Sequence, residues 1–170
     1  ENVLPEFTDY SMKNRTYRYI EEKPLYPFGY GLSYGNVICK EATMLSNGVE
    51  ANDHPVNVME DQLQIHLILQ NESDIATRDV IQVYCKNHDS LHAVRNVSLC
   101  AFKSITIGAW KKEEFNLTIP KSAFFTVDEE GNKKVDGSRF SFYIGTQAPD
   151  ERSRELTDKR VLELQVNHVS

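Results

Sequence analysis

Leu63-Gln64-Ile65-His66-Leu67-Ile68-Leu69-Gln70 is the stretch that decides the fold class of this 170-residue chain. Leucine or isoleucine stands at every odd position, and polar side chains stand at three of the four even positions. Because successive side chains of a β-strand point to opposite faces, this period of two predicts a strand with one face in a core and the other in water. A helix would instead need apolar residues three and four positions apart.

The same alternation returns along the rest of the chain. It is clear at residues 81–85, 115–119, 140–144 and 162–166, and weaker at 37–45 and 97–107. Turn-forming residues such as Asn47-Gly48 separate these runs. We therefore expect an all-β sandwich of the immunoglobulin or fibronectin type III-like kind, with about seven strands that each have one solvent-facing side. No segment shows convincing helical spacing, apart from a turn near 121–125.

The first 34 residues have a different character. Pro24, Pro27, Gly29 and Gly31 punctuate them, and no regular period persists. We predict an extended amino-terminal arm over residues 1–34 and one sandwich over residues 35–170. The aromatic rings of the arm need a further surface to bury them. They are our candidate docking residues: Tyr10, Tyr17, Tyr19, Tyr26, Phe28, Tyr30 and Tyr34.

The charge balance limits the partners. The chain has 19 basic and 25 acidic residues, which give a net charge of −6, and its basic residues are scattered. Nucleic acids and anionic membranes bind clustered Lys and Arg, so we expect neither as a partner. No run approaches the roughly 18 to 20 apolar residues that cross a bilayer. The sequence therefore predicts a soluble protein, and leaves open whether it is cytoplasmic or secreted.

Catalytic motifs are missing from the sequence. It has no Gly-x-Ser-x-Gly elbow and no phosphate-binding loop. The acidic groups at 21–22, 113–114 and 128–130 lie beside turns or lysines, where carboxylates stay solvated. We therefore expect no catalytic residue and no cofactor.

One set of side chains is similar to a zinc site. Cys85, His88, His92 and Cys100 offer the thiolate and imidazole groups that zinc accepts. However, Cys85 is in phase with the apolar residues of its strand and should point into the core, and the spacing fits known zinc patterns loosely. We therefore predict no metal site. The odd number of cysteines, three, favours reduced and mostly buried thiols.

Trp110 is the only tryptophan and suggests a second kind of function. It follows Gly108-Ala109 in an expected turn between strands, where an exposed indole could stack on a sugar ring. With Tyr143 as a second aromatic platform, the chain would be a carbohydrate-binding or adhesive module. A tryptophan at the edge of the core is the competing interpretation.

Three motifs of the arm and three of the sandwich point to one protein family. The arm contains Phe7-Thr8-Asp9-Tyr10-Ser11-Met12, Arg15-Thr16-Tyr17-Arg18-Tyr19 and Pro24-Leu25-Tyr26-Pro27-Phe28-Gly29-Tyr30-Gly31-Leu32-Ser33-Tyr34. The sandwich contains Asp79-Val80-Ile81-Gln82-Val83-Tyr84, Leu99-Cys100-Ala101-Phe102-Lys103 and Gln147-Ala148-Pro149-Asp150. In this order they resemble family 3 glycoside hydrolases, from the end of the second domain through the carboxyl-terminal fibronectin type III-like domain. The arm is most similar to bacterial β-xylosidase and β-glucosidase members.

The resemblance implies a non-catalytic, stabilising domain of a larger enzyme of carbohydrate catabolism. Members of this family are retaining enzymes whose Asp nucleophile and general acid/base lie in the two preceding domains, and neither motif occurs here. Retention needs two carboxyl groups about 5 to 5.5 Å apart, so we expect the isolated chain to be inert. The implied partners are the catalytic domains of the same polypeptide, or a second copy that packs against the arm.

Overall fold

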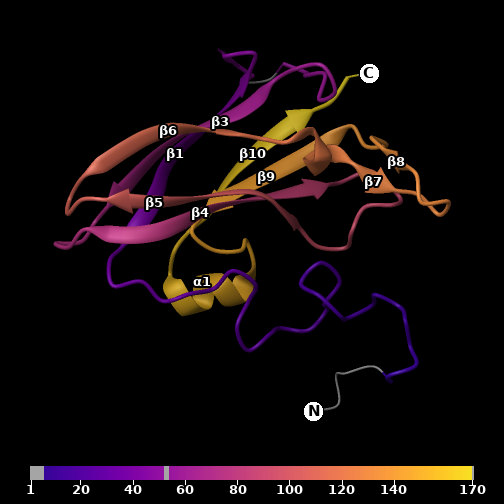
Figure 1. Cartoon of the computed structure of the whole chain (residues 1–170), viewed down its shortest axis with the longest axis horizontal. Helices are drawn as coiled ribbons and strands as arrows, with labels where there is room; N and C mark the ends of the chain where they lie inside the picture. The colour runs from indigo at the N-terminus through magenta and orange to yellow at the C-terminus, as the bar shows by residue number, and fades with distance from the viewer. Residues whose placement is uncertain (1–5, 52–53, 170) are drawn as a thin grey trace.

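Two four-stranded sheets pack face to face in the computed structural model, which describes residues 6–51 and 54–169 (Figure 1). One sheet contains β1 (Val37–Ser46), β2 (Val49–Glu50), β3 (Leu63–Asn71) and β6 (Lys112–Thr118), in the order β2-β1-β3-β6. The other contains β4 (Thr77–Asn87), β5 (Ser98–Ile107), β9 (Arg139–Gly145) and β10 (Leu162–Asn167), in the order β10-β9-β4-β5. All neighbouring strands of these sheets are antiparallel.

The alternating runs of the sequence are the long strands of the structure. On β3, Leu63, Ile65, Leu67 and Leu69 are buried, while the side chains between them are half-buried. Phe140, Phe142 and Ile144 of β9 face them from the other sheet within one continuous core. The all-β sandwich prediction is therefore confirmed.

A short 3₁₀ helix and a small hairpin follow β6. The helix η1 (Lys121–Phe124) lies at the predicted turn, and the hairpin pairs β7 (Thr126–Val127) with β8 (Lys133–Lys134). Phe124 of η1 is fully buried, and its ring meets those of Phe140 and Phe142 edge-on at centroid distances of 5.0 and 5.7 Å. Edge-to-face contacts of this kind add to the burial of the rings themselves.

The expectation that every strand has a wet face was wrong for β4. Its residues Ile81, Gln82, Val83, Tyr84 and Cys85 are all buried. The odd-numbered ones face the core, as predicted, whereas Gln82 and Tyr84 contact the arm on the outer face. The alternation reports the polarity of the side chains, and it does not reveal that another segment covers the outer face.

A helix that the sequence pattern did not predict, α1 (Glu151–Thr157), precedes β10. Asp150 caps it, since its side chain accepts hydrogen bonds from Ser153 N (2.7 Å) and Ser153 Oγ (2.9 Å). Asp158 ends it in the left-handed conformation. A helix of two turns is too short for an apolar period, but the Asp cap followed by Glu151 was a usable signal.

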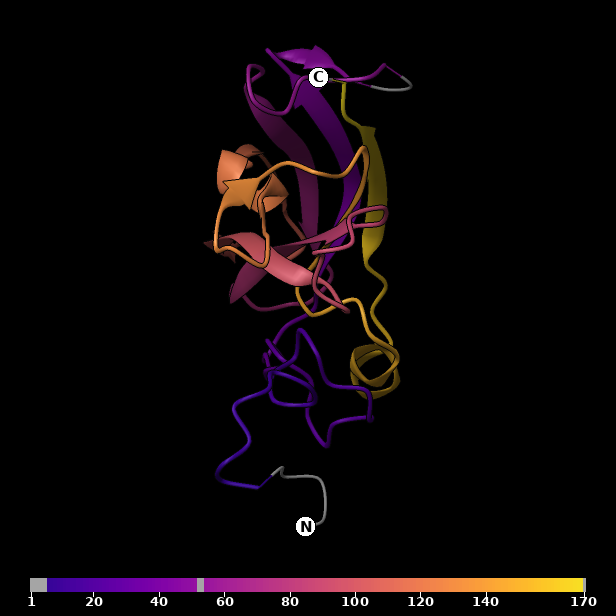
Figure 2. The same ribbon diagram turned by 90° about the vertical axis from the view of Figure 1, so that its right-hand side faces the viewer.

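The described part of the predicted arm, residues 6–34, contains turns but no strand or helix. Residues 1–5 of the prediction lie outside the described residues. Figure 2 shows the arm beyond one end of the sandwich, beside α1. Neither helix of the described ranges has the length and apolarity to cross a bilayer.

Candidate functional site

The inner side of the arm is bound to the sandwich by backbone and aromatic contacts. Tyr17 and Phe28 stack with their ring centroids 4.0 Å apart, and the Tyr17 hydroxyl accepts a hydrogen bond from Leu99 N at 3.0 Å. Asn96 Nδ2 donates to the carbonyls of Tyr17 and Ile20, both at 2.9 Å. The arm therefore has a defined position along the β4–β5 edge of the sandwich.

Gly29 marks the closest approach of the arm to β4. Gln82 Nε2 donates to the Gly29 carbonyl at 3.1 Å, and the Tyr84 hydroxyl donates to Gln82 Oε1 at 2.6 Å. Gly29 has a φ of +75°, and a Cβ there would lie 2.4 Å from Gln82 Oε1. Only glycine meets both conditions. Burial also raises the pKa of Tyr84 well above its ordinary value, so that its hydroxyl remains a donor.

Ion pairs join the middle of the arm to α1 and to the β4–β5 loop. Lys23 pairs with Glu155, and Arg95 pairs with Glu21 at 2.9 Å. Arg152 Nε donates to the Leu25 carbonyl at 3.2 Å. The hydrogen bond from Lys23 lowers the pKa of Glu155. Since these groups are largely exposed, they fix the register of the arm more than they stabilise it.

The seven predicted docking aromatics divide into two groups. Tyr17, Tyr19 and Tyr30 are half-buried, and Phe28, at 44% exposed, stacks on Tyr17. The other three, which we call the outward aromatics, are 89%, 63% and 100% exposed: Tyr10, Tyr26 and Tyr34. In the first group, the Tyr17 hydroxyl is bonded to β5. In the second group, Tyr26 stacks on Tyr30 with ring centroids 5.5 Å apart, and all three rings remain largely exposed.

Trp110 lies in the turn between β5 and β6 and is 64% exposed, so it is not a tryptophan of the core edge. Tyr143, the second aromatic of the proposed sugar platform, is on β9 and half-buried, and burial raises its pKa. Trp110 therefore lies in a turn that connects the two sheets, whereas Tyr143 lies on a strand of one of them. Among the described residues, no ring contact joins the two into one platform.

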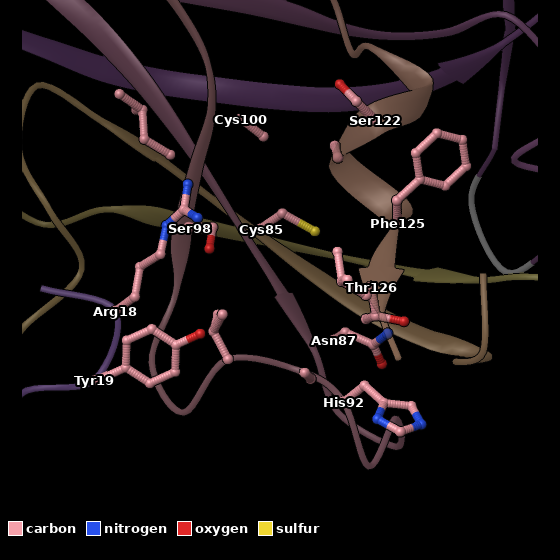
Figure 3. Close-up of a pocket in the computed structure, with 15 residues that line it drawn as sticks. Arg18, Tyr19, Cys85, Asn87, His92, Ser98, Cys100, Ser122, Phe125 and Thr126 are labelled. Carbon is pink, nitrogen blue, oxygen red and sulfur yellow. The ribbon is translucent and has the colours of Figure 1, made fainter. Parts of the chain in front are cut away.

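Three of the four predicted thiol and imidazole residues, Cys85, His92 and Cys100, line a hollow of about 410 Å³ between the arm and η1. Figure 3 shows Cys85 and Cys100 in its wall and His92 at its rim. Burial raises the pKa of Cys100 to about 12 and that of Cys85 well above its ordinary value, so both remain thiols at neutral pH. His88 does not line this hollow; its Nε2 lies 2.8 Å from Ser141 Oγ. Within residues 6–51 and 54–169, no three His, Cys, Asp or Glu side chains are arranged to hold a metal ion.

The acidic groups occupy structural positions. Asp128 accepts hydrogen bonds from the backbone of Glu130 and Asn132 in the β7–β8 hairpin, which lowers its pKa. Burial raises the pKa of Asp79, and its carboxyl group lies 3.9 Å from the Lys159 ammonium. No second carboxylate lines the hollow that contains Asp79. Asp79 therefore has no partner with which to form a pair of general acid and nucleophile.

The chain is similar to one part of several longer proteins. Residues 79–148 match the family model of the fibronectin type III-like domain. The xylan 1,4-β-xylosidase of Xylanibacter ruminicola is 30% identical over 158 residues, which are 92% of this chain but 17% of that protein. The chain therefore spans about a sixth of the length of this relative.

Solved β-glucosidases share the fold. The β-glucosidase of Listeria innocua in complex with gluconolactone has 23% identity and a TM-score of 0.66, over 92% of this chain and 20% of that one. The GH3 β-glucosidase of Bifidobacterium adolescentis has 19% identity and a TM-score of 0.63, over 83% of this chain and 18% of that one. In both, the matching part is again about one fifth of the protein.

Proposed function

Since residues 79–148 form a fibronectin type III-like domain, we propose that this chain is the non-catalytic, stabilising part of a family 3 β-glycosidase and that its arm docks it onto the catalytic part. The observation that carries the proposal is the alignment of 92% of the chain with 17% of a β-xylosidase. A match that nearly fills one protein and leaves most of the other unmatched is typical of one domain in a multidomain enzyme.

The arm supports the docking role. Tyr17 is bonded to the sandwich, whereas Tyr10, Tyr26 and Tyr34 remain largely exposed. Burying rings of this size, at about 25 cal/mol per Å² of apolar surface, stabilises a complex by several kcal/mol before the entropy of ordering is subtracted. A further surface of the same polypeptide is the partner that the length of the relatives suggests.

The geometry of the carboxylates supports the absence of catalysis. Glu113 and Glu114 are exposed on β6, and Asp79 has a cation beside it. Two-carboxylate hydrolysis with retention needs both groups on either side of one scissile bond. We therefore place the nucleophile and the general acid/base in the catalytic part of the parent polypeptide.

A complementation assay tests the proposal. The chain is assayed alone, and then mixed with the amino-terminal portion of its parent, on aryl β-xyloside and aryl β-glucoside. We expect no nitrophenol release from the chain alone and a rate in the mixture above that of the amino-terminal portion by itself. The substrate that is cleaved would also distinguish a β-xylosidase from a β-glucosidase.

Two results would overturn the proposal. Hydrolysis by the chain alone would show that it holds its own catalytic site. No change in the rate or the thermal stability of the amino-terminal portion on mixing would show that the chain does not stabilise it.

Carbohydrate binding is the second candidate, because Trp110 is exposed enough for its indole to stack on a sugar. Its emission should then be quenched by millimolar oligosaccharide. Unchanged emission across xylo- and gluco-oligosaccharides would exclude this function for Trp110.

A further inference from the structure

We propose that Trp110 is part of the surface that contacts the catalytic part of the parent polypeptide, together with Tyr34 and Ile75. These three residues form what we call the end patch. The proposal rests on the proposed function and adds to it a second contact, carried by the sandwich itself rather than by the arm alone.

A buried amide brings two segments of the end patch together. Asn71 is fully buried at the end of β3, and its Nδ2 lies 2.7 Å from the Ile75 carbonyl, 3.1 Å from that of Ile107 and 3.2 Å from that of Gly108. The β3–β4 loop and the β5–β6 turn are therefore tied to one side chain. Figure 1 shows this loop and this turn at the same end of the sandwich.

Ser73 adds the other connections. Its carbonyl accepts a hydrogen bond from Trp110 N at 3.1 Å, so the β5–β6 turn is fixed directly to the β3–β4 loop. Gly35 packs against the same loop, since a Cβ on it would lie 2.6 Å from Ser73 Oγ. Tyr34 precedes this glycine, which brings the end of the arm to the same place.

The side chains that these bonds position are apolar and exposed. Tyr34 is 100% exposed, Trp110 64% and Ile75 43%. Trp110 also has a φ of 57°, a left-handed conformation that is strained for a residue other than glycine. The described chain leaves most of this indole exposed, although the backbone that carries it is strained and held in place. Backbone strain of this kind is concentrated at functional positions.

The position of the end patch indicates its partner. Tyr34 is one of the outward aromatics, so the patch shares a residue with the group through which the arm is proposed to dock. The relative in which this chain matches 17% of the length has ample further polypeptide to cover both. We therefore assign the patch to the catalytic part of the same polypeptide rather than to a sugar.

The single tryptophan allows a direct test. Labelling the chain with 5-fluorotryptophan gives one ¹⁹F resonance, which reports on Trp110 alone. On titration with the unlabelled amino-terminal portion of the parent, we expect this resonance to shift and to become less sensitive to solvent. Xylobiose and cellobiose, added without that portion, should leave it unchanged.

Variants separate contact from folding. Trp110→Gly relieves the left-handed strain, so it should unfold at the same or a higher denaturant concentration and yet bind the amino-terminal portion at least tenfold more weakly. Leu91→Ala is the control, because Leu91 is 97% exposed in the β4–β5 loop, at the opposite end of β4 from Ile75. Its affinity should equal that of the unchanged chain.

The outcomes distinguish the two proposals. Binding with an unshifted resonance and an unweakened Trp110→Gly variant would overturn the end patch and leave the docking function in place. A shift with the disaccharides alone would show that Trp110 is a sugar platform and would also overturn the end patch. If the unchanged chain did not bind at all, the docking function would fail, and the end patch with it.

Discussion

At the scale of single residues, buried polar side chains organise this molecule. Asn71 joins three backbone carbonyls at one end of the sandwich, and Gln82 joins the arm to β4. Gln82 stands at a polar position of the strand pattern, where an exposed side chain was expected. A buried amide with all its partners present has the same signature in the sequence as a solvated one, so only the structure reveals it.

Replacing Asn71 with alanine should therefore destabilise the chain. The change removes an amide that donates to three backbone carbonyls and accepts from Ser73, and each lost hydrogen bond costs about 0.5–1.5 kcal/mol. We expect a loss of roughly 2–4 kcal/mol in the free energy of unfolding, measured with urea. Asn116→Ala, on the exposed side of β6, should stay within about 0.5 kcal/mol of the unchanged chain; an equal loss in both variants would contradict this role of Asn71.

The buried thiols should make stability depend on alkaline pH. Burial raises the pKa of Cys39 and Cys100 from the ordinary value of 9.0 to about 12. Between these values the unfolded chain has lost protons that the folded chain retains, so unfolding becomes easier as the pH rises. The stabilising contribution is complete below pH 9 and is lost towards pH 12.

Two measurements check this prediction. Urea unfolding at pH 8 and pH 10 should show a smaller decrease in stability for Cys100→Ala than for the unchanged chain. A disulfide reagent at pH 8 should react with the native thiols at least about 100 times more slowly than with the unfolded chain, since a pKa near 12 leaves a thiolate fraction of only ~10⁻⁴. Rapid labelling of the native chain would show that the thiols are not desolvated.

At the scale of elements, the position of the arm and the burial of β4 depend on each other. The arm has no regular secondary structure among its described residues, yet it has a fixed place because Gln82 and Tyr84 project from the outer face of β4. In turn, β4 is buried on both faces only because the arm covers one of them. The contact depends on a glycine that allows the two backbones to approach.

A matched pair of glycine variants tests this contact. Gly29→Ala should loosen the arm, because its Cβ would overlap Gln82 and its φ of +75° disfavours alanine. Gly31→Ala should have no such effect, since no atom lies within 4 Å of its Cβ position. Hydrogen exchange at the Leu99 amide, which donates to Tyr17, should become at least about tenfold faster in the first variant only; equal exchange in both would place the arm elsewhere.

At the scale of the whole molecule, the chain has a well-filled core and an incompletely covered exterior. The core extends through both sheets and includes Phe124, Phe140 and Phe142. Apart from Phe102 of β5, the exposed aromatic side chains of the described residues lie on the arm and on the end patch. This distribution is typical of a domain that folds around its own core and is completed by a neighbouring domain.

The double variant Tyr10→Ser, Tyr26→Ser should separate folding from docking. Both rings are largely exposed, so the midpoint of urea unfolding should stay unchanged. Affinity for the amino-terminal portion of the parent, measured by calorimetry, should fall at least tenfold, whereas Leu91→Ser should leave it unchanged. Unchanged affinity in the double variant would show that the arm does not dock through these rings.

The sandwich fold could be predicted from the sequence alone, because a period of two assigns the core-facing side of each strand without reference to any other segment. The sequence also predicted that Cys85 faces inward, which the structure confirms. It did not predict α1, because seven residues are too few to establish a helical period.

Which aromatic rings of the arm are covered depends on the tertiary structure, as does the hydrogen bond that ties the turn of Trp110 to the β3–β4 loop. Those relations depend on Asn71, Ser73 and Gln82, whose hydrogen-bond partners lie up to 64 positions away along the chain. Contacts between distant segments are set by how the two sheets bring their ends together, and no local pattern of residues records them.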